Sequence, residues 1–180
     1  MDCFWAQGFE QTSVRDLAER MGITGASLYN AFGDKRSLYR QAFVYYLAQT
    51  VRDRVARFEK LAPFAAIEAF FAEIVDHSVN DKQYRGCMLV NAALELAPYD
   101  PEIQKLVAEE MVFIEAFFCR CIEAGQKDGS IVSTRPAEEL AKLLLSVLFG
   151  IRVLARTRPE REVLEGAVNG ALTSLGKAAR

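Results

Sequence analysis

Apolar residues recur at helical spacing along most of the chain, which predicts an all-helical fold. Near the N-terminus, two short amphipathic runs stand on either side of Gly22. A glycine at that point ends the first helix in a left-handed conformation without steric cost. Thr12 or Ser13 is placed to cap the first helix and Thr24 the second, since a side-chain oxygen there accepts a hydrogen bond from a free backbone N–H.

The two short helices differ in what they present to solvent. In the second helix, Leu28 and Phe32 point back at the first, and Ile23 fills the corner between the two. The apolar face of the first helix consists of Val14, Leu17, Ala18 and Met21. The opposite face of the second helix carries small or hydrogen-bonding residues: Gly25, Ala26, Ser27, Tyr29 and Asn30. An angled second helix with a compact polar front suits a helix-turn-helix entering a major groove, although an ordinary helical hairpin shares these features.

Further helices follow, and their starts are marked by caps and prolines. Asp34 is placed to cap a long helix that runs to Phe58, and Lys35 lies at its N-terminus, where it would approach a phosphate. Proline is tolerated in the first turn of a helix, where its missing N–H costs nothing. This rule predicts helices that begin near Pro63, Pro101 and Pro136, and after Pro159.

A short apolar helix over residues 87–97 carries one polar stripe, formed by Cys87, Asn91 and Glu95 at intervals of four. This stripe either faces water or lines a cavity for a small-molecule effector. Aromatic residues lie on the two helices that flank this one. Phe71 lies on the preceding predicted helix, and Phe113 and Phe117 lie on the following one. Such residues either stack on a flat apolar effector or belong to the core.

The last two predicted helices, residues 137–156 and 160–177, are candidates for a subunit interface. The first is apolar over a wide arc, and a helix of that kind is buried on more than one side. In a chain of this size, the second side is most simply another copy of the chain. Gly166 and Gly170 allow close approach along the second helix.

Charge and composition restrict the function. The net charge is −2, and up to Arg40 five basic residues balance five acidic ones, which excludes a protein that coats nucleic acid nonspecifically. Four cysteines and one histidine show no metal-ligand spacing, so we expect no metal site and no cofactor. The longest apolar stretch, residues 143–151, is too short to span a bilayer, and we expect a cytoplasmic protein with reduced thiols. A thiol-dependent enzyme that uses Cys87 and His77, or a ligand carrier, is the alternative.

The residues from Gly8 to Leu47 resemble the DNA-binding domain of TetR-type transcriptional repressors. The resemblance rests on Gly8-Phe9, Thr12-Ser13, Ala18-Glu19, Gly22-Ile23, Ser27-Leu28-Tyr29, Phe32, Asp34-Lys35 and Leu38-Tyr39. It implies an all-α homodimer with a three-helix DNA-binding domain (residues 1–47) and a helical effector-binding and dimerisation domain (residues 48–180). The chain starts inside the first helix of the family pattern, so we expect either that this helix is short or that the start has been assigned too late.

The resemblance also implies a function for this sequence, which is that of a ligand-responsive repressor and not an enzyme. Two recognition helices of a dimer would enter successive major grooves of a palindromic operator, and an effector would release the DNA. The residues expected to contact phosphates are Thr12, Thr24, Tyr29 and Lys35. Those expected to read base edges are Gly25, Ala26, Ser27 and Asn30, with Asn30 able to pair with adenine.

Overall fold

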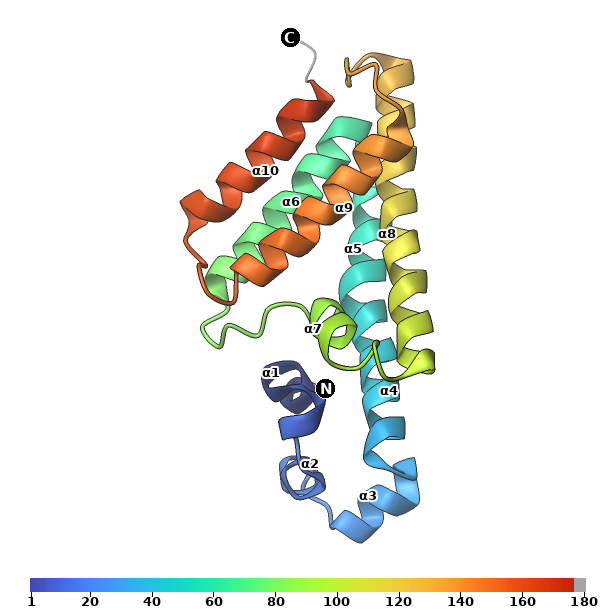
Figure 1. The fold of residues 1–180 in the computed structure, drawn as a ribbon, viewed down its shortest axis with the longest axis vertical. Helices are drawn as coiled ribbons and strands as arrows, with labels where there is room; N and C mark the ends of the chain where they lie inside the picture. Colours follow the sequence, from blue (N-terminus) through green and yellow to red (C-terminus); the bar gives the residue numbers. More distant parts are fainter. Residues whose placement is uncertain (177–180) are drawn as a thin grey trace.

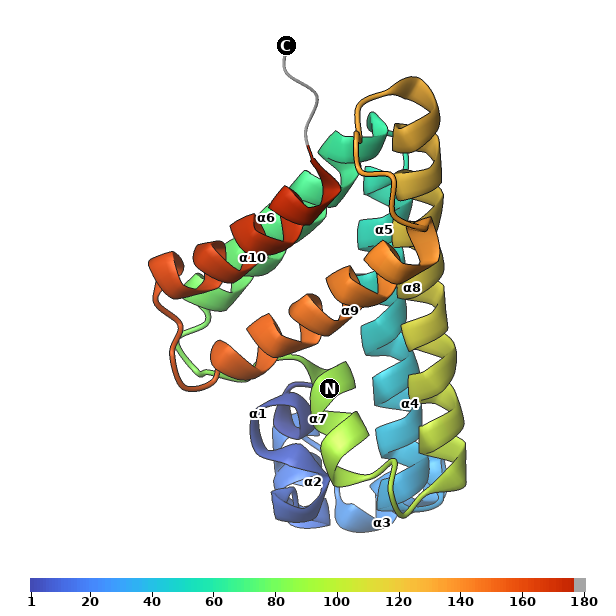
Figure 2. The same ribbon diagram turned by 45° about the horizontal axis from the view of Figure 1, so that its top comes forward.

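The computed structural model describes residues 1–176, which form helices joined by short loops, and the all-α prediction is confirmed. A small N-terminal unit lies at one end of the molecule, and α6, α9 and α10 lie at the other (Figures 1 and 2). The N-terminal unit comprises α1 (Asp2–Gln11), α2 (Val14–Met21) and α3 (Gly25–Phe32). The helices that follow residue 62 form the body of the molecule. They are α6 (Pro63–Asn80), α7 (Met88–Glu95), α8 (Pro101–Asp128), α9 (Ala137–Leu154) and α10 (Arg161–Leu175).

One long rod connects the two ends of the molecule and runs beside α8 (Figure 1). It consists of α4 (Lys35–Leu47), the π-helical segment η1 (Ala48–Arg52) and α5 (Asp53–Phe58). The helix predicted from Asp34 to Phe58 is therefore continuous, but it contains a π-helical turn that the sequence pattern did not reveal. The helix predicted over 160–177 ends at Leu175, and residue 177 lies outside the described residues.

The core of the body contains a cluster of phenylalanines where α6 packs on α8. Phe70, Phe71, Phe117 and Phe118 are all fully buried. The rings of Phe71 and Phe118 stack with their centroids 5.6 Å apart, and those of Phe70 and Phe117 lie at 5.5 Å. Each ring contact of this kind adds roughly 0.5–1.5 kcal/mol beyond the area that it buries.

Three arginines on one side of the rod bind carboxylates of α8 or its cap. The pairs are Arg36–Asp100 (3.0 Å), Arg40–Glu102 (2.8 Å) and Arg52–Glu110 (2.8 Å). Glu110 is buried, and burial raises the pKa of its carboxyl. These three ion pairs lie along the interface between the rod and α8.

The carboxylate of Glu95 joins α7 to the first helix. At Gly8 the backbone of α1 takes a left-handed φ of 81°, and the helix kinks there. The next two N–H groups, those of Phe9 and Glu10, donate to Oε2 and Oε1 of Glu95 at 3.0 and 2.8 Å. A Cβ at position 8 would lie 2.7 Å from Oε2 of Glu95, so both the backbone conformation and the close contact require glycine.

Replacing Glu95 with alanine removes both acceptors and leaves two amides of α1 without partners. We expect the free energy of unfolding to fall by about 1–3 kcal/mol, the usual range for hydrogen bonds to a charged group. Urea unfolding measures this loss, and hydrogen exchange should show faster exchange of the Phe9 and Glu10 amides.

The matched control is Glu102→Ala, which removes an exposed carboxylate paired with Arg40. That pair lies in solvent, so its removal should cost about 0.5 kcal/mol or less. Equal losses in the two variants would contradict the role given to Glu95.

Candidate nucleic-acid interface and effector cavity

The first helix of the helix-turn-helix, α2, is closed at both ends by the residues expected to do so. Ser13, and not Thr12, is its cap: Ser13 Oγ accepts the N–H of Asp16 at 3.1 Å, and the Ser13 N–H donates to the Asp16 carboxylate at 3.0 Å. This reciprocal pair is a capping box. Gly22 ends α2 in the left-handed conformation with φ 67°.

The second helix, α3, has the buried back and polar front that the sequence predicts. Its cap is Thr24, whose Oγ1 accepts the N–H of Ser27 at 3.1 Å. Leu28 is fully buried and Phe32 is half-buried, so these two residues hold the helix against its neighbours. The residues expected to face DNA are exposed or, in one case, half-buried: Thr24, Gly25, Ala26, Ser27, Tyr29 and Asn30.

Two apolar residues beside the turn are less covered than expected. Met21 is 44% exposed and Ile23 is 37% exposed, so Ile23 does not fill the corner between the helices. Met21 is the last residue of α2, and Ile23 lies in the turn that follows it. Leu17 and Ala18, one turn earlier in α2, are the residues that the neighbouring helices cover.

Two of the expected phosphate contacts have partners within the protein. Thr12 is completely buried, and its Oγ1 donates to the carbonyl of Gly8 at 2.6 Å, so the expectation that it contacts a phosphate is wrong for this conformation. Lys35 is half-buried, and its Nζ donates to the carbonyl of Phe9 at 2.9 Å. The same ammonium lies 4.2 Å from the centroid of the Phe9 ring. Lys35 therefore ties the start of α4 to the end of α1.

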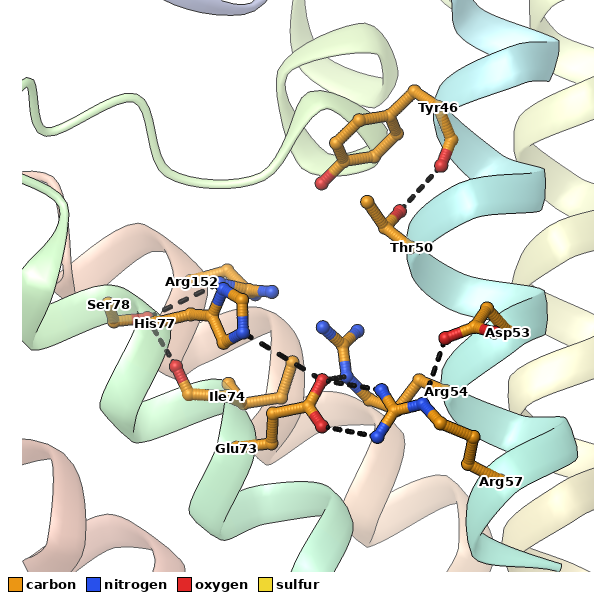
Figure 3. A network of polar contacts seen from close by, with 10 residues as sticks. All are labelled: Tyr46, Thr50, Asp53, Arg54, Arg57, Glu73, Ile74, His77, Ser78 and Arg152. Atoms are coloured by element: carbon orange, nitrogen blue, oxygen red, sulfur yellow. Dashed lines mark hydrogen bonds and ion pairs between the residues drawn. The ribbon is translucent and has the colours of Figure 1, made fainter.

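A cavity of about 500 Å³ lies between the N-terminal unit, the rod, α6 and the end of α9. Figure 3 shows Tyr46 and Arg54 from the rod and His77 and Arg152 from the body arranged around the same space. The other residues that line it are Trp5, Gln49, Thr50, Arg57, Glu73, Ser78, Asp81, Arg85, Gly86 and Ala155. A volume of this size suits a small organic ligand.

The first helix supplies one wall of this cavity through Trp5. Its indole Nε1 donates to the carbonyl of Gly86 at 3.3 Å, and its ring centroid lies 5.1 Å from that of Tyr46. The guanidinium of Arg85 lies 4.1 Å from the centroid of the indole ring. This cavity is therefore bounded by the N-terminal unit as well as by the body.

The charges in the cavity are unevenly paired. Glu73 accepts hydrogen bonds from both Arg54 and Arg57, each at 2.8 Å. Arg85 pairs with Asp81 at 3.1 Å. Arg57 also pairs with Asp53, which does not line the cavity, at 2.8 Å (Figure 3). The pKa of His77 is lowered, first by burial and then by the positive charge of Arg54.

The six residues predicted for an effector pocket do not come together, and none of them lines the 500 Å³ cavity. Phe71 and Phe117 belong to the aromatic core, and Glu95 binds α1. Phe113 lies beneath the guanidinium of Arg52, with 4.8 Å between them. Asn91 donates to the carbonyl of Arg85 and accepts from Arg156, each at 3.1 Å. The polar stripe of Cys87, Asn91 and Glu95 thus binds neighbouring segments and does not line the 500 Å³ cavity, although Asn91 and Glu95 are only half-buried.

Cys87 is buried at the cap position of α7 and accepts a hydrogen bond from the hydroxyl of Tyr46 at 3.6 Å. His77 lines the large cavity, whereas Cys87 lines a separate one of about 20 Å³. The two residues proposed for a thiol-dependent enzyme are therefore not brought together.

One other group has the composition of a metal site. The ligand atoms of Cys119, Glu123 and Glu138 lie within 4.8 Å of one another on the surface. Burial and then the two carboxylates raise the pKa of the Cys119 thiol, which disfavours the thiolate that binds metal. In the part of the chain that the structure describes, no helix combines the length and apolarity needed to cross a membrane.

The geometry of α2 and α3 defines a helix-turn-helix protein of the class that regulates transcription. Residues 1–42 match the family described as "Bacterial regulatory proteins, tetR family", and residues 63–171 match "Tetracyclin repressor-like, C-terminal domain". The chain belongs to the TetR family of regulators.

Relatives span nearly the whole chain. The regulator YezE of Bacillus subtilis is 27% identical over 97% of this chain and 91% of its own length. The repressor ComR of Escherichia coli is 25% identical over 91% of this chain and 79% of its own length. A cysteine mutant of the TetR-family regulator CifR, solved in complex with a 26-base-pair operator, is 32% identical. Its structure matches 97% of this chain and 91% of that one with a TM-score of 0.84.

The capping box predicts a measurable change at Asp16. The hydrogen bond from the Ser13 hydroxyl, followed by the one from its backbone, lowers the pKa of Asp16 from 3.8. A lowered folded pKa means that the carboxylate stabilises the fold above the ordinary pKa, and that this contribution is lost as the pH falls through the lowered value. Ser13→Ala should raise the pKa of Asp16 towards 3.8 in an NMR titration.

Arg15→Gln is the matched control, because the charge of Arg15 is the smallest contribution to the lowered pKa of Asp16. If this variant moves the pKa further than Ser13→Ala does, the capping hydroxyl is not the main cause.

Proposed function

We propose that this protein is a ligand-responsive transcriptional repressor that binds a palindromic operator as a homodimer. The observation that carries the proposal is the exposed polar face of α3, held in place by the buried Leu28 and capped by Thr24. Relatives named as repressors and the operator complex of CifR support it. We assign DNA binding to residues 1–47, and effector binding and dimerisation to the chain from residue 48 onward.

The residues of this interface divide into two roles. Thr24 and Tyr29 are our candidates for phosphate contacts, and Lys35 joins them with its ammonium also bound to α1. The candidates for base contacts are Gly25, Ala26, Ser27 and Asn30. The amide of Asn30 has the donor and acceptor pair that matches adenine in the major groove.

The homodimer forms through α9 and α10 in this proposal. Both helices carry half-buried apolar residues in the single chain, among them Val147 and Leu172. Gly166 and Gly170 of α10 have no heavy atom within 4 Å of a Cβ built on them, so their surface is open for a partner helix. A two-fold dimer places two copies of α3 to match a two-fold operator.

The effector site in this proposal is the 500 Å³ cavity, which replaces the pocket predicted from the sequence. Trp5 of α1 and Tyr46 of the rod both line it, so a ligand there contacts the elements that orient α3. The rod also contains η1, whose Gln49 and Thr50 face the same cavity. An effector that binds one orientation of the rod more tightly shifts the spacing of the two recognition helices and releases the DNA.

Asn30→Ala tests the assignment of base contacts. We expect affinity for the operator to fall by about 10- to 100-fold, because one bidentate base contact is lost. Binding to random duplex DNA and the salt dependence of operator binding should stay as in the wild type, since no phosphate contact is removed. The operator is selected from DNA upstream of the gene. Fluorescence anisotropy then measures the affinity for the operator, the affinity for random duplex DNA and the salt dependence of operator binding.

The matched control is Gln104→Ala, an exposed amide on α8 that lies outside the helix-turn-helix. It should bind operator and random DNA like the wild type. An Asn30→Ala variant that weakens both kinds of DNA equally would place Asn30 among the phosphate contacts.

Gly170→Arg tests the dimer interface. The open space around Gly170 accommodates a side chain within one chain, so the protomer should fold normally. A paired α10 has no room for it, and we expect a monomer in sedimentation velocity together with loss of operator binding. Ala108→Arg, on the exposed face of α8, should remain dimeric. A dimeric Gly170→Arg variant would rule out close packing at this part of α10.

A further inference from the structure

Arg152 in the last turn of α9 is a buried cation that lacks an acidic partner. The residue is 8% exposed, and its one hydrogen bond goes from Nη1 to the hydroxyl of Ser78 at 3.3 Å. Among the described residues, no carboxylate forms an ion pair with it. The described buried side-chain atoms that lack a hydrogen-bond partner are Glu110 Oε1 and Ser130 Oγ, so the other nitrogens of Arg152 are not sealed from the cavity that it lines. These N–H groups are therefore free to donate to an acceptor that enters the cavity.

A second buried arginine, Arg54, lines the same cavity and adds to its positive charge. Arg54 is 5% exposed, and its pKa is lowered first by burial and then by the charge of Arg152. Its partner Glu73 is shared with Arg57, which has a second carboxylate partner in Asp53 outside the cavity. The four arginines that line the cavity face two carboxylates, and the cavity is therefore positively charged.

The walls of the cavity show what kind of anion fits. Trp5 and Tyr46 provide aromatic surface, and the volume of about 500 Å³ is far larger than an inorganic ion needs. One unpaired guanidinium presents two parallel N–H groups to one planar carboxylate. The hydroxyls of Tyr46, Thr50 and Ser78 line the same space (Figure 3).

We infer that this cavity binds a small organic acid, with its carboxylate on Arg152 and its apolar or aromatic part against Trp5 and Tyr46. The inference rests on the proposed function, in which this cavity is the effector site. The carboxylate supplies the acidic partner that Arg152 lacks among the described residues. Because Trp5 belongs to α1, the same ligand contacts the DNA-binding unit directly.

The experiment compares acids with their neutral amides on the full-length protein. Benzoate and 3-phenylpropionate are titrated by calorimetry, beside benzamide, 3-phenylpropanamide and inorganic phosphate. We expect at least one of the two carboxylates to bind about tenfold or more tightly than its amide and than phosphate, since hydrogen bonds to a charged group are stronger than neutral ones.

Arg152→Gln should weaken binding of the carboxylate by about 10-fold or more and bring the acid and its amide to similar affinities. Without ligand, the same variant should have a higher Tm than the wild type, because an unpaired buried charge has been removed. Arg158→Gln is the matched control: this arginine is exposed, does not line the cavity, and should leave both properties unchanged.

Three results would overturn the inference: no binding by either carboxylate, equal binding of acids and amides, or an Arg152→Gln variant with wild-type affinity. Tighter binding of phosphate than of both carboxylates would also overturn it, since the ligand would then be an inorganic anion. Operator binding is measured separately without any ligand. Its loss would contradict the proposed function, whereas intact operator binding with a failed ligand assay contradicts only the inference.

Discussion

The position of the first helix depends on a carboxylate that belongs to another part of the molecule. The N-terminal unit is too small to bury much apolar surface by itself, and its first helix has 10 residues with a kink at Gly8. Two N–H groups beyond the kink bind Glu95 of α7, and the indole of Trp5 binds the loop at Gly86. Contacts with the body therefore hold α1 in place, whereas α3 packs against α2 and α4.

Buried charges are concentrated along the rod, where the N-terminal unit meets the body. Glu110 is buried against one exposed arginine, and its Oε1 has no hydrogen-bond partner among the described atoms. On the other side of the rod, Arg54 and Arg152 share a cavity. Such groups seldom give the most stable packing, because apolar residues of similar volume often do as well or better.

The sequence was sufficient to predict the helices and the polar front of α3, because both depend on local rules. Helical spacing of apolar residues, the caps Ser13, Thr24 and Asp34, and the glycine at the turn all act within one or two turns of chain. The residues of the large cavity could not be found in that way. They come from α1, the rod, α6 with the loop that follows it, and the end of α9, which are distant in the chain. Arginine and glutamate on amphipathic helices also usually face solvent.

Two particular residues show where sequence pattern misleads. Glu95 lies on a polar stripe, and the stripe alone cannot distinguish a face toward water from a face toward another helix. Arg152 ends an apolar helix, where a cation ordinarily complements the helix dipole at the surface. The position of Arg152 at the end of an apolar helix could have indicated the cavity from the sequence. The apolar residues of that helix instead predict a subunit interface.

The π-helical turn in the rod determines which face of the helix meets which neighbour. Buried residues recur every four positions at Tyr39, Phe43, Leu47, Val51 and Val55. Four residues advance an ordinary α-helix about 40° beyond a full turn, so a stripe with this spacing would rotate steadily around the helix. The wider turn of η1 compensates for part of that rotation. One continuous helix therefore keeps a single buried side from the N-terminal unit to the body. Deleting one residue from η1 would restore the ordinary pitch and turn the N-terminal unit about the axis of the rod, although no residue of that unit would change.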